Sequence, residues 1–197
     1  MIGALLRETI VEPRGAARRL MAMRLDLRTV WMAFALVMVL GTALGLLMRM
    51  VFPVPRELLD QMPLLRLQDQ PLIAGAVQSI FLIAIAWAMA AIGRRFGGDG
   101  RFDQTLLLVS WMEFTLMMVQ VVQIFATLLF PPVATLIGFA GFGLFFMLLT
   151  VFSAEANGFT SLPLVFLGVL ASLLLAALVA AVFFVFFGLM PIPEVGN

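Results

Sequence analysis

The sequence GRRFGGDGRFD (93–103), followed without a break by QTLLLVSWMEFTLMMVQVVQIFATLLF (104–130), decides the fold. A loop of glycines and arginines leads into an apolar run that is long enough to cross a membrane as a helix. Glu113 lies near the middle of that run. A carboxylate at such a depth costs about 2.5 kcal/mol or more unless it is protonated or paired. The run therefore predicts a membrane helix and marks Glu113 as a residue that needs a partner.

The composition of the whole chain agrees with a membrane protein. Hydrophobic residues make up 63% of it and charged residues 12%, whereas a soluble domain has about 25% charged residues. All basic residues are arginine, and histidine, cysteine, tyrosine and lysine do not occur. These absences exclude disulfides, thiolate and imidazole catalysis, Schiff-base chemistry and the usual zinc sites. We expect no enzyme, no cofactor, no metal and no nucleic-acid partner, and we expect membrane lipids as partners.

Five apolar segments are long enough to span a membrane. They cover residues 29–50, 72–92, 104–130, 133–153 and 164–188. The third and fourth are divided only by Pro131-Pro132, because no charged residue occurs between Phe114 and Ala154. The pattern predicts an all-α polytopic membrane protein, with a five-span domain over 29–190 and a short external tail over 191–197.

Residues 1–28 form a basic segment ahead of the first span. Arginines alternate there with apolar residues, and after Pro13 the residues Ala17, Leu20 and Met21 recur at helical spacing. This pattern favours an amphipathic helix over 14–27 that lies at the membrane surface. A basic tail that only orients the first span explains the charge equally well. The mixed-charge link over 49–69 is expected on the opposite surface.

The distribution of arginine predicts the orientation of the spans. Arginines are most frequent in the N-terminal segment and recur in the loop 93–103, whereas the turn at 131–132 has none. Positive charges accumulate on the cytoplasmic side of membrane proteins. We therefore expect the N-terminus and the loops 93–103 and 154–163 in the cytoplasm and the C-terminus outside. The expected location is the bacterial inner (plasma) membrane.

Polar residues form a stripe along the third span. Glu113 and Gln120 are seven residues apart and nearly aligned, and Gln123 lies about 60° further round the helix. The candidate hydrogen-bond partners in other spans are Gln78, Ser79, Thr150 and Ser172. The stripe is interpreted as a proton or cation path, as hydrogen bonding that joins helices, or as an interface with another protein. Because no other span holds a matching arginine, histidine or carboxylate, helix joining is favoured.

Two loops carry the remaining candidate residues. The residues of the first that we expect to turn the chain and contact lipid headgroups are Arg94, Arg95, Gly97, Gly98, Gly100, Arg101 and Phe102. A phosphate-binding loop is disfavoured because the Gly-Lys-Ser/Thr ending is missing and the loop follows a helix. The second loop contributes Glu155, Asn157, Gly158 and Phe159. With one acid and no histidine there, a helix cap and turn is favoured over a hydrolytic or metal site.

Small residues predict where helices approach one another closely. Gly41 and Gly45 are four residues apart in the first span, and a stripe in the last span consists of Gly168, Ser172, Ala176 and Ala180. This spacing allows close helix packing in a membrane. For the glycine pair we expect packing within the protein. The stripe in the last span could pack within one bundle or between copies.

Three motifs accompany the five spans. They are Val11-Glu12-Pro13 in the basic segment, Gly97-Gly98-Asp99-Gly100-Arg101-Phe102 before the third span, and FSAEANGF (152–159) after the fourth. Together they resemble the bacterial branch of the YIP (Ypt/Rab-interacting protein) family over about residues 5–188. The resemblance implies a non-enzymatic integral membrane protein, associated in the eukaryotic branch with vesicle trafficking and membrane shaping.

The chain departs from the eukaryotic branch in two places. It lacks a long N-terminal region with an Asp-Leu-Tyr-Gly-Pro-type motif, and Ser110-Trp111-Met112-Glu113 stands where that branch has Gly-Tyr with a following proline. GTPase binding is therefore not expected to carry over. We expect a membrane-organising or partner-scaffolding role, with further copies of the chain or other membrane proteins as partners. The alternative is a small transporter or channel component that uses Glu113, Gln120 and Gln123.

Overall fold

The computed structural model describes residues 2–51 and 70–186, and all regular secondary structure in these ranges is helical. The helices are α1 (Ile2–Val11), α2 (Pro13–Ala22), α3 (Leu27–Val51), α6 (Pro71–Arg95), α7 (Phe102–Leu129), α8 (Pro131–Asn157) and α9 (Leu162–Phe186). The all-α fold class expected from the sequence is confirmed. The expectations for the link after residue 51 and for the C-terminal tail fall outside the described residues.

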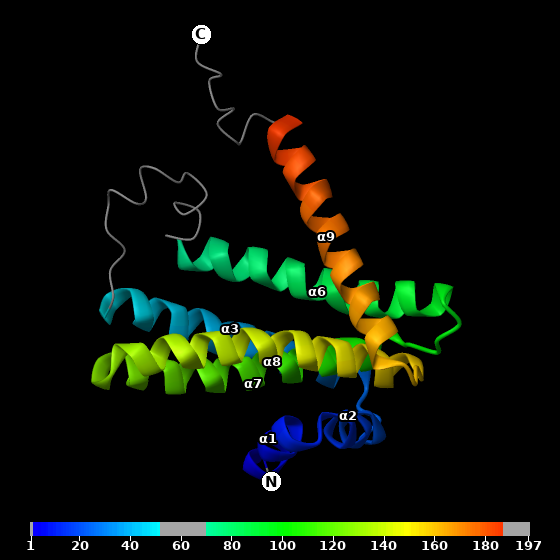
Figure 1. Ribbon diagram of the computed structural model, residues 1–197, viewed down its shortest axis with the longest axis horizontal. Coiled ribbons are helices and arrows are strands. Elements are labelled where there is room, and N and C mark those ends of the chain that lie inside the picture. Colours follow the sequence, from blue (N-terminus) through cyan, green and yellow to red (C-terminus); the bar gives the residue numbers. More distant parts are fainter. Residues whose placement is uncertain (1, 52–69, 187–197) are drawn as a thin grey trace.

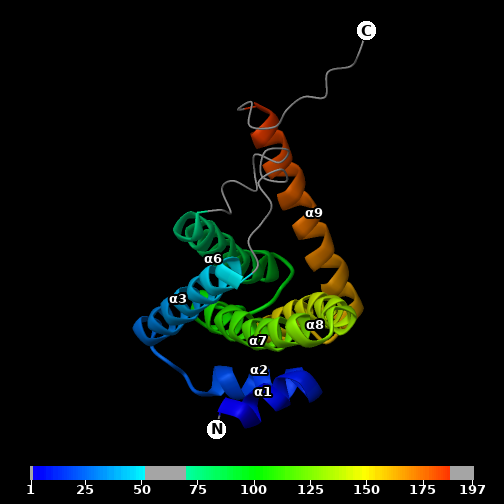
Figure 2. The same ribbon diagram turned by 90° about the vertical axis from the view of Figure 1, so that its left-hand side faces the viewer.

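Five of these helices, α3, α6, α7, α8 and α9, are long and apolar enough to cross a membrane. The protein is therefore a multi-pass membrane protein, as the hydropathy pattern predicts. Four of the five helices run side by side as a bundle, whereas α9 leaves the bundle at a steep angle (Figures 1 and 2). We call the end where α3 and α7 begin and where α6 and α8 end the entry end of the bundle.

The core lies at the entry end. Its buried apolar side chains are concentrated in the first half of α7 and the last part of α8. Leu106, Leu108 and Met112 of α7 are almost completely buried, as are Leu148 and Phe152 of α8. Helix α7 contacts α3, α6 and α8 and is the most enclosed of the five long helices. The opposite halves of α7 and α8 carry mostly exposed or half-buried apolar side chains, which is the surface that hydrocarbon would cover.

Proline and glycine set the ends of the long helices. Pro71 and Pro131 occupy first helical positions, where the missing N–H is not needed. The break at Pro131-Pro132 is confirmed, because only Phe130 lies between α7 and α8. Helix α8 ends at Gly158, whose φ of 72° is left-handed, and the Phe159 N–H then donates to the Ala154 carbonyl oxygen at 2.8 Å. This glycine-terminated cap is the one expected for the second loop.

Helices approach one another closely at glycines other than the Gly41 and Gly45 pair of α3. A Cβ added at Gly41 or Gly45 would meet nothing within 4 Å among residues 2–51 and 70–186, so the described helices do not pack closely on this pair. A Cβ at Gly138 of α8 would lie 2.8 Å from the Gln123 amide nitrogen of α7. The spacing of small residues shows where close approach is allowed, and the neighbouring helix decides where it happens.

The basic N-terminal segment folds as two helices rather than one. α1 and α2 lie together against one side of α7 and α8 (Figure 2). The helix expected over 14–27 begins at Pro13 and already ends at Ala22, because Arg24 adopts a left-handed conformation with φ of 45°. From α1, the fully buried Thr9 hydroxyl accepts a 2.8 Å hydrogen bond from the Trp111 indole nitrogen of α7. Tertiary packing therefore holds this segment on the bundle.

Candidate functional site at the α2–α8 junction

The candidate residues of both loops meet at the entry end, on the side that α2 covers. We call this place the junction and define it by Arg14 and Arg18 of α2, Glu155 and Asn157 of α8, and the glycine loop of residues 96–101. In the chain these parts lie far apart. The fold brings them together because α2 packs on α8 and the glycine loop turns beside the end of α8.

Glu155 binds α2 through two arginines. Its Oε1 lies 3.4 Å from Arg14 Nε, and its Oε2 lies 3.2 Å from Arg18 Nε. The two arginines are four residues apart, so they lie on the same face of α2. Arg14 also donates from Nη2 to the Thr160 carbonyl oxygen at 3.2 Å. Because the Glu155 side chain is only 14% exposed, solvent screens these pairs less than a fully exposed ion pair.

Asn157 joins the end of α8 to α6. Its residue is 4% exposed, and its Nδ2 donates to the Met89 carbonyl oxygen at 3.1 Å and to the Ser153 carbonyl oxygen at 2.9 Å. The Met89 bond crosses between helices, whereas the Ser153 bond stays within α8. Each such bond contributes about 1 kcal/mol, and both are sheltered from water. The second loop is thus tied into the bundle by its asparagine.

Three glycines enclose the Asn157 side chain. A Cβ added at Gly93, Gly98 or Gly100 would collide with the side chain of Asn157. Gly97 differs, because its φ of 85° is left-handed and a side chain there would be strained without meeting any neighbour. Space for Asn157 therefore explains three of the glycines, and backbone conformation explains the fourth. A turn that is merely flexible would need neither space for a neighbouring side chain nor a left-handed backbone.

The arginines at the end of α6 and in the glycine loop have different surroundings. Arg94 and Arg95 of α6 are both exposed, and Arg94 donates from Nη1 to the Gly100 carbonyl oxygen at 3.2 Å and so closes the loop. Arg101 forms two hydrogen bonds of 3.1 Å with Asp103. The ring of Phe102 lies 6.2 Å from that of Trp31, at the start of α3. Contact between these arginines and lipid headgroups stays a prediction.

The polar stripe of α7 splits between two neighbouring helices. Glu113 Oε1 accepts a 2.6 Å hydrogen bond from Gln78 Nε2 of α6, so the expectation that the acid is hydrogen-bonded is confirmed and Gln78 is its partner. Gln123 instead lies beside Gly138 of α8, and Gln120 is exposed. The three residues therefore do not face one common helix or cavity in the described part of the chain.

Two contacts of the N-terminal helices are absent from the sequence-based expectations. Neither the pairing of Arg14 and Arg18 with Glu155 nor the bond from Trp111 to Thr9 was predicted. The first had a signal, since a lone acid in the second loop and two arginines at helical spacing carry opposite charges. The second had none, because a tryptophan in an apolar helix gives no indication of the hydroxyl that it binds.

The chemistry of the junction is that of a structural joint. Among residues 2–51 and 70–186 no group of three acidic, histidine or cysteine residues is placed to hold a metal ion. Glu155 is paired with Arg14 and Arg18, and the buried amide of Asn157 donates to backbone carbonyl oxygens. The arrangement holds α2, α6 and α8 in fixed positions at the entry end.

The fold and the site define a polytopic α-helical membrane protein whose N-terminal helices are docked on its bundle. The Yip1 domain family matches residues 7–187, so the chain belongs to this family. The resemblance to the YIP family seen in the motifs is thereby confirmed, and its bacterial branch stays a prediction. No curated protein and no solved structure matches the chain.

Proposed function

We propose that this Yip1 domain protein is a non-enzymatic membrane-organising protein whose copies associate side by side through α9. The single observation that carries the proposal is the position of α9. It is the most apolar of the long helices and has no buried residue over Leu162–Val182. In Figures 1 and 2 the C-terminal half of α9 stands apart from the four-helix bundle.

The first half of α9 packs on α8 and the second half does not. Phe166 of α9 lies 6.4 Å from Phe146 of α8 between ring centroids, and Val169 and Leu173 pack at the edge of the core. From Leu174 to Ala180 every residue is exposed. The helix is thus attached at the entry end and leaves its second half for other contacts within the membrane.

The small-residue stripe of α9 supports association with another helix. Gly168, Ala176 and Ala180 are exposed and Ser172 is half-buried, so the described bundle leaves the part of the stripe formed by Ala176 and Ala180 uncovered. In lipid, helices associate mainly through close van der Waals packing, which small residues permit. Lipid chains solvate a leucine surface well, but a second helix fits a narrow face of glycine and alanine more closely.

The junction supports the same role by fixing the N-terminal helices to the bundle. Arginines gather at the entry end in α2, the glycine loop and the end of α6, which favours a cytoplasmic location for that end. We extend the proposal to this orientation, with the C-terminus on the external side of a bacterial inner membrane. The pairing of Gln78 with Glu113 supports a helix-joining role for the stripe of α7.

Energy transfer between labelled copies in liposomes tests the proposal. The chain contains no cysteine, so one cysteine introduced by Asp99→Cys in the exposed loop can carry a donor or an acceptor dye. We expect transfer above the level of randomly distributed copies, and a clear fall when Ala176→Leu fills the small-residue face. Leu178→Ala, on the opposite face of α9, is the matched control and should leave transfer unchanged. Random-level transfer at every protein density would refute association between copies.

A further inference from the structure

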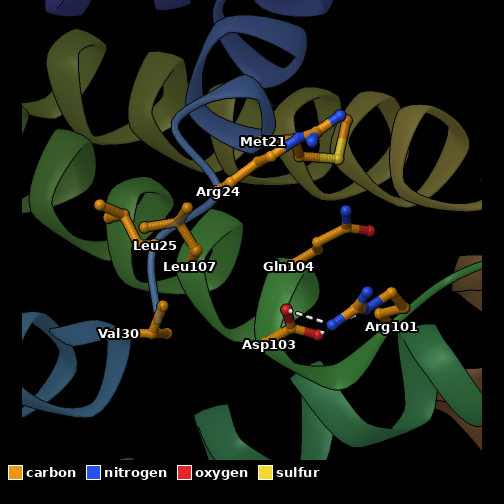
Figure 3. A pocket seen from close by; sticks show the side chains of 8 residues that line it. All are labelled: Met21, Arg24, Leu25, Val30, Arg101, Asp103, Gln104 and Leu107. Carbon is orange, nitrogen blue, oxygen red and sulfur yellow. Dashed lines mark hydrogen bonds and ion pairs between the residues drawn. The ribbon is translucent and has the colours of Figure 1, made fainter. Parts of the chain in front are cut away.

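We infer that a pocket at the entry end binds the phosphate group of an anionic phospholipid. The pocket has a volume of about 360 Å³, within the range of about 300–1,000 Å³ that is usual for small-molecule sites. Its walls come from the end of α2, the link from α2 to α3, and the first turns of α3 and α7 (Figure 3). The inference does not depend on association through α9.

One side of the pocket carries hydrogen-bond donors. They are Arg24 from the α2–α3 link and Arg101 and Gln104 from the start of α7. In the view of Figure 3 the Gln104 amide lies between the two arginine side chains. Two guanidinium groups from separate elements present planar forks of N–H donors, which match the oxygens of a phosphate group.

The other side of the pocket is apolar. Leu25, Val30 and Leu107 form it, and Met21 adds a flexible side chain beside Arg24 (Figure 3). A free inorganic phosphate would use only the donor side of such a pocket. A phospholipid would use both, because its phosphate is followed by a glycerol backbone and acyl chains.

The depth of the pocket fits a lipid headgroup. Trp31 lies one turn into α3, is 38% exposed and contacts the ring of Phe102, the first residue of α7. Amphipathic aromatic rings such as tryptophan concentrate at the level of the headgroups. The pocket lies at the same level, since its walls include the beginnings of both α3 and α7.

The charges of the pocket favour an anion. The side chain of Arg24 has no hydrogen bond or ion pair within the described ranges 2–51 and 70–186, and Arg101 uses only its Nε and Nη2 atoms for Asp103. Asp103 is the sole acid in the lining, against two arginines. Asp26, in the same link, lies outside the lining and is hydrogen-bonded by the Thr29 hydroxyl, which lowers the pKa of its carboxyl group. A phosphate would therefore meet a net positive site.

The backbone conformation of Arg24 supports a binding role for its side chain. Its left-handed backbone is unusual for a residue with a side chain, and it directs the link away from the axis of α2. Glycine or asparagine would fit that conformation more easily. An arginine at this place supplies a charge that the backbone alone does not require.

The test measures phospholipid binding to the purified full-length protein in detergent by native mass spectrometry. The probes are phosphatidylglycerol, phosphatidylcholine and glycerol 3-phosphate. We expect retention of one phosphatidylglycerol in preference to phosphatidylcholine, and weak binding of glycerol 3-phosphate. Arg24→Gln should weaken phosphatidylglycerol binding on the order of tenfold, because it removes a charged donor. Arg24→Lys should keep most of the affinity.

Arg7→Gln is the matched control, since it removes the same charge from an exposed arginine of α1 outside the pocket. It should leave binding unchanged. Equal losses in the Arg24→Gln and Arg7→Gln variants would overturn the inference, because they would show attraction to the overall charge only. Equal retention of the two phospholipids by the unaltered protein would also overturn it, and this comparison needs no substitution. Binding of glycerol 3-phosphate as strong as that of phosphatidylglycerol would assign the pocket to a soluble phosphate instead.

Discussion

Replacing Gly93 by alanine should destabilise the protein, although the same change at Gly143 of α8 should not. Gly93 lies in the last turn of α6, where alanine alone would improve helix stability by about 1 kcal/mol. The added Cβ would collide with the buried Asn157 side chain, which two hydrogen bonds hold in place. Overpacking of this kind costs about 1–3 kcal/mol, and the fixed amide favours the upper value. The net loss is about 2 kcal/mol.

A double-mutant cycle isolates the collision. In an Asn157→Ala background the new methyl group has room, so Gly93→Ala should raise stability by about 1 kcal/mol, its intrinsic helix effect. The change of sign gives a coupling free energy of about 3 kcal/mol between the two positions. Gly143→Ala in α8 is the matched control, because a Cβ there meets no atom of the described residues within 4 Å. It should be neutral or slightly stabilising.

The assay is unfolding of the purified protein in mixed micelles, followed by circular dichroism against denaturant and against temperature. For a chain of this size, 2 kcal/mol corresponds to a fall in Tm of about 4–8 °C. The reasoning is refuted if Gly93→Ala and Gly143→Ala change stability in the same direction. It is also refuted if the effects of Gly93→Ala and Asn157→Ala simply add.

Three further substitutions test the other contacts. Glu113→Leu should lower the free energy of unfolding by about 0.6–2 kcal/mol, because it removes the hydrogen bond from Gln78 of α6. Glu113→Gln should have a mild effect. Equal effects of the two substitutions, or loss of a proton-dependent flux in liposomes in the folded Glu113→Gln variant, would count against helix joining. Glu155→Gln should speed amide hydrogen exchange in α2 and lower the free energy of unfolding by about 1 kcal/mol. Glu8→Gln should lower it less, because it removes a more exposed ion pair with Arg19. A larger loss of stability in Glu8→Gln than in Glu155→Gln would contradict the role of the junction. Trp111→Phe should speed exchange in α1 by removing its indole bond, and unchanged exchange would show that packing alone holds α1.

The span pattern was predictable because lipid leaves the backbone few choices. Every N–H and C=O within the hydrocarbon needs an internal partner, so long apolar runs become helices. Pro131-Pro132 divides a run that is too long for one crossing, and the structure turns there within one residue. Gln78 was predictable as a candidate partner for Glu113 because few polar residues occur in the other spans.

The faces of the helices were not predictable in the same way. A four-residue spacing such as Gly41 and Gly45 permits close approach but does not select the helix that approaches. The contact between the glycine loop and Asn157 depends on how α6, α7 and α8 lie together, which local sequence does not encode. Charge pairs such as Arg14 with Glu155 are long-range contacts, and several other arginines at the entry end were equally available by charge alone.

The central claim is that copies of this protein meet along the small-residue face of α9. Disulfide cross-linking in native membranes tests it most directly, since the cysteine-free chain allows one cysteine to be introduced at a time. Oxidation should produce a linked dimer with Ala176→Cys and little or none with Leu178→Cys on the opposite face. Absence of a dimer with Ala176→Cys, or equal dimer yields with both variants, would contradict the claim.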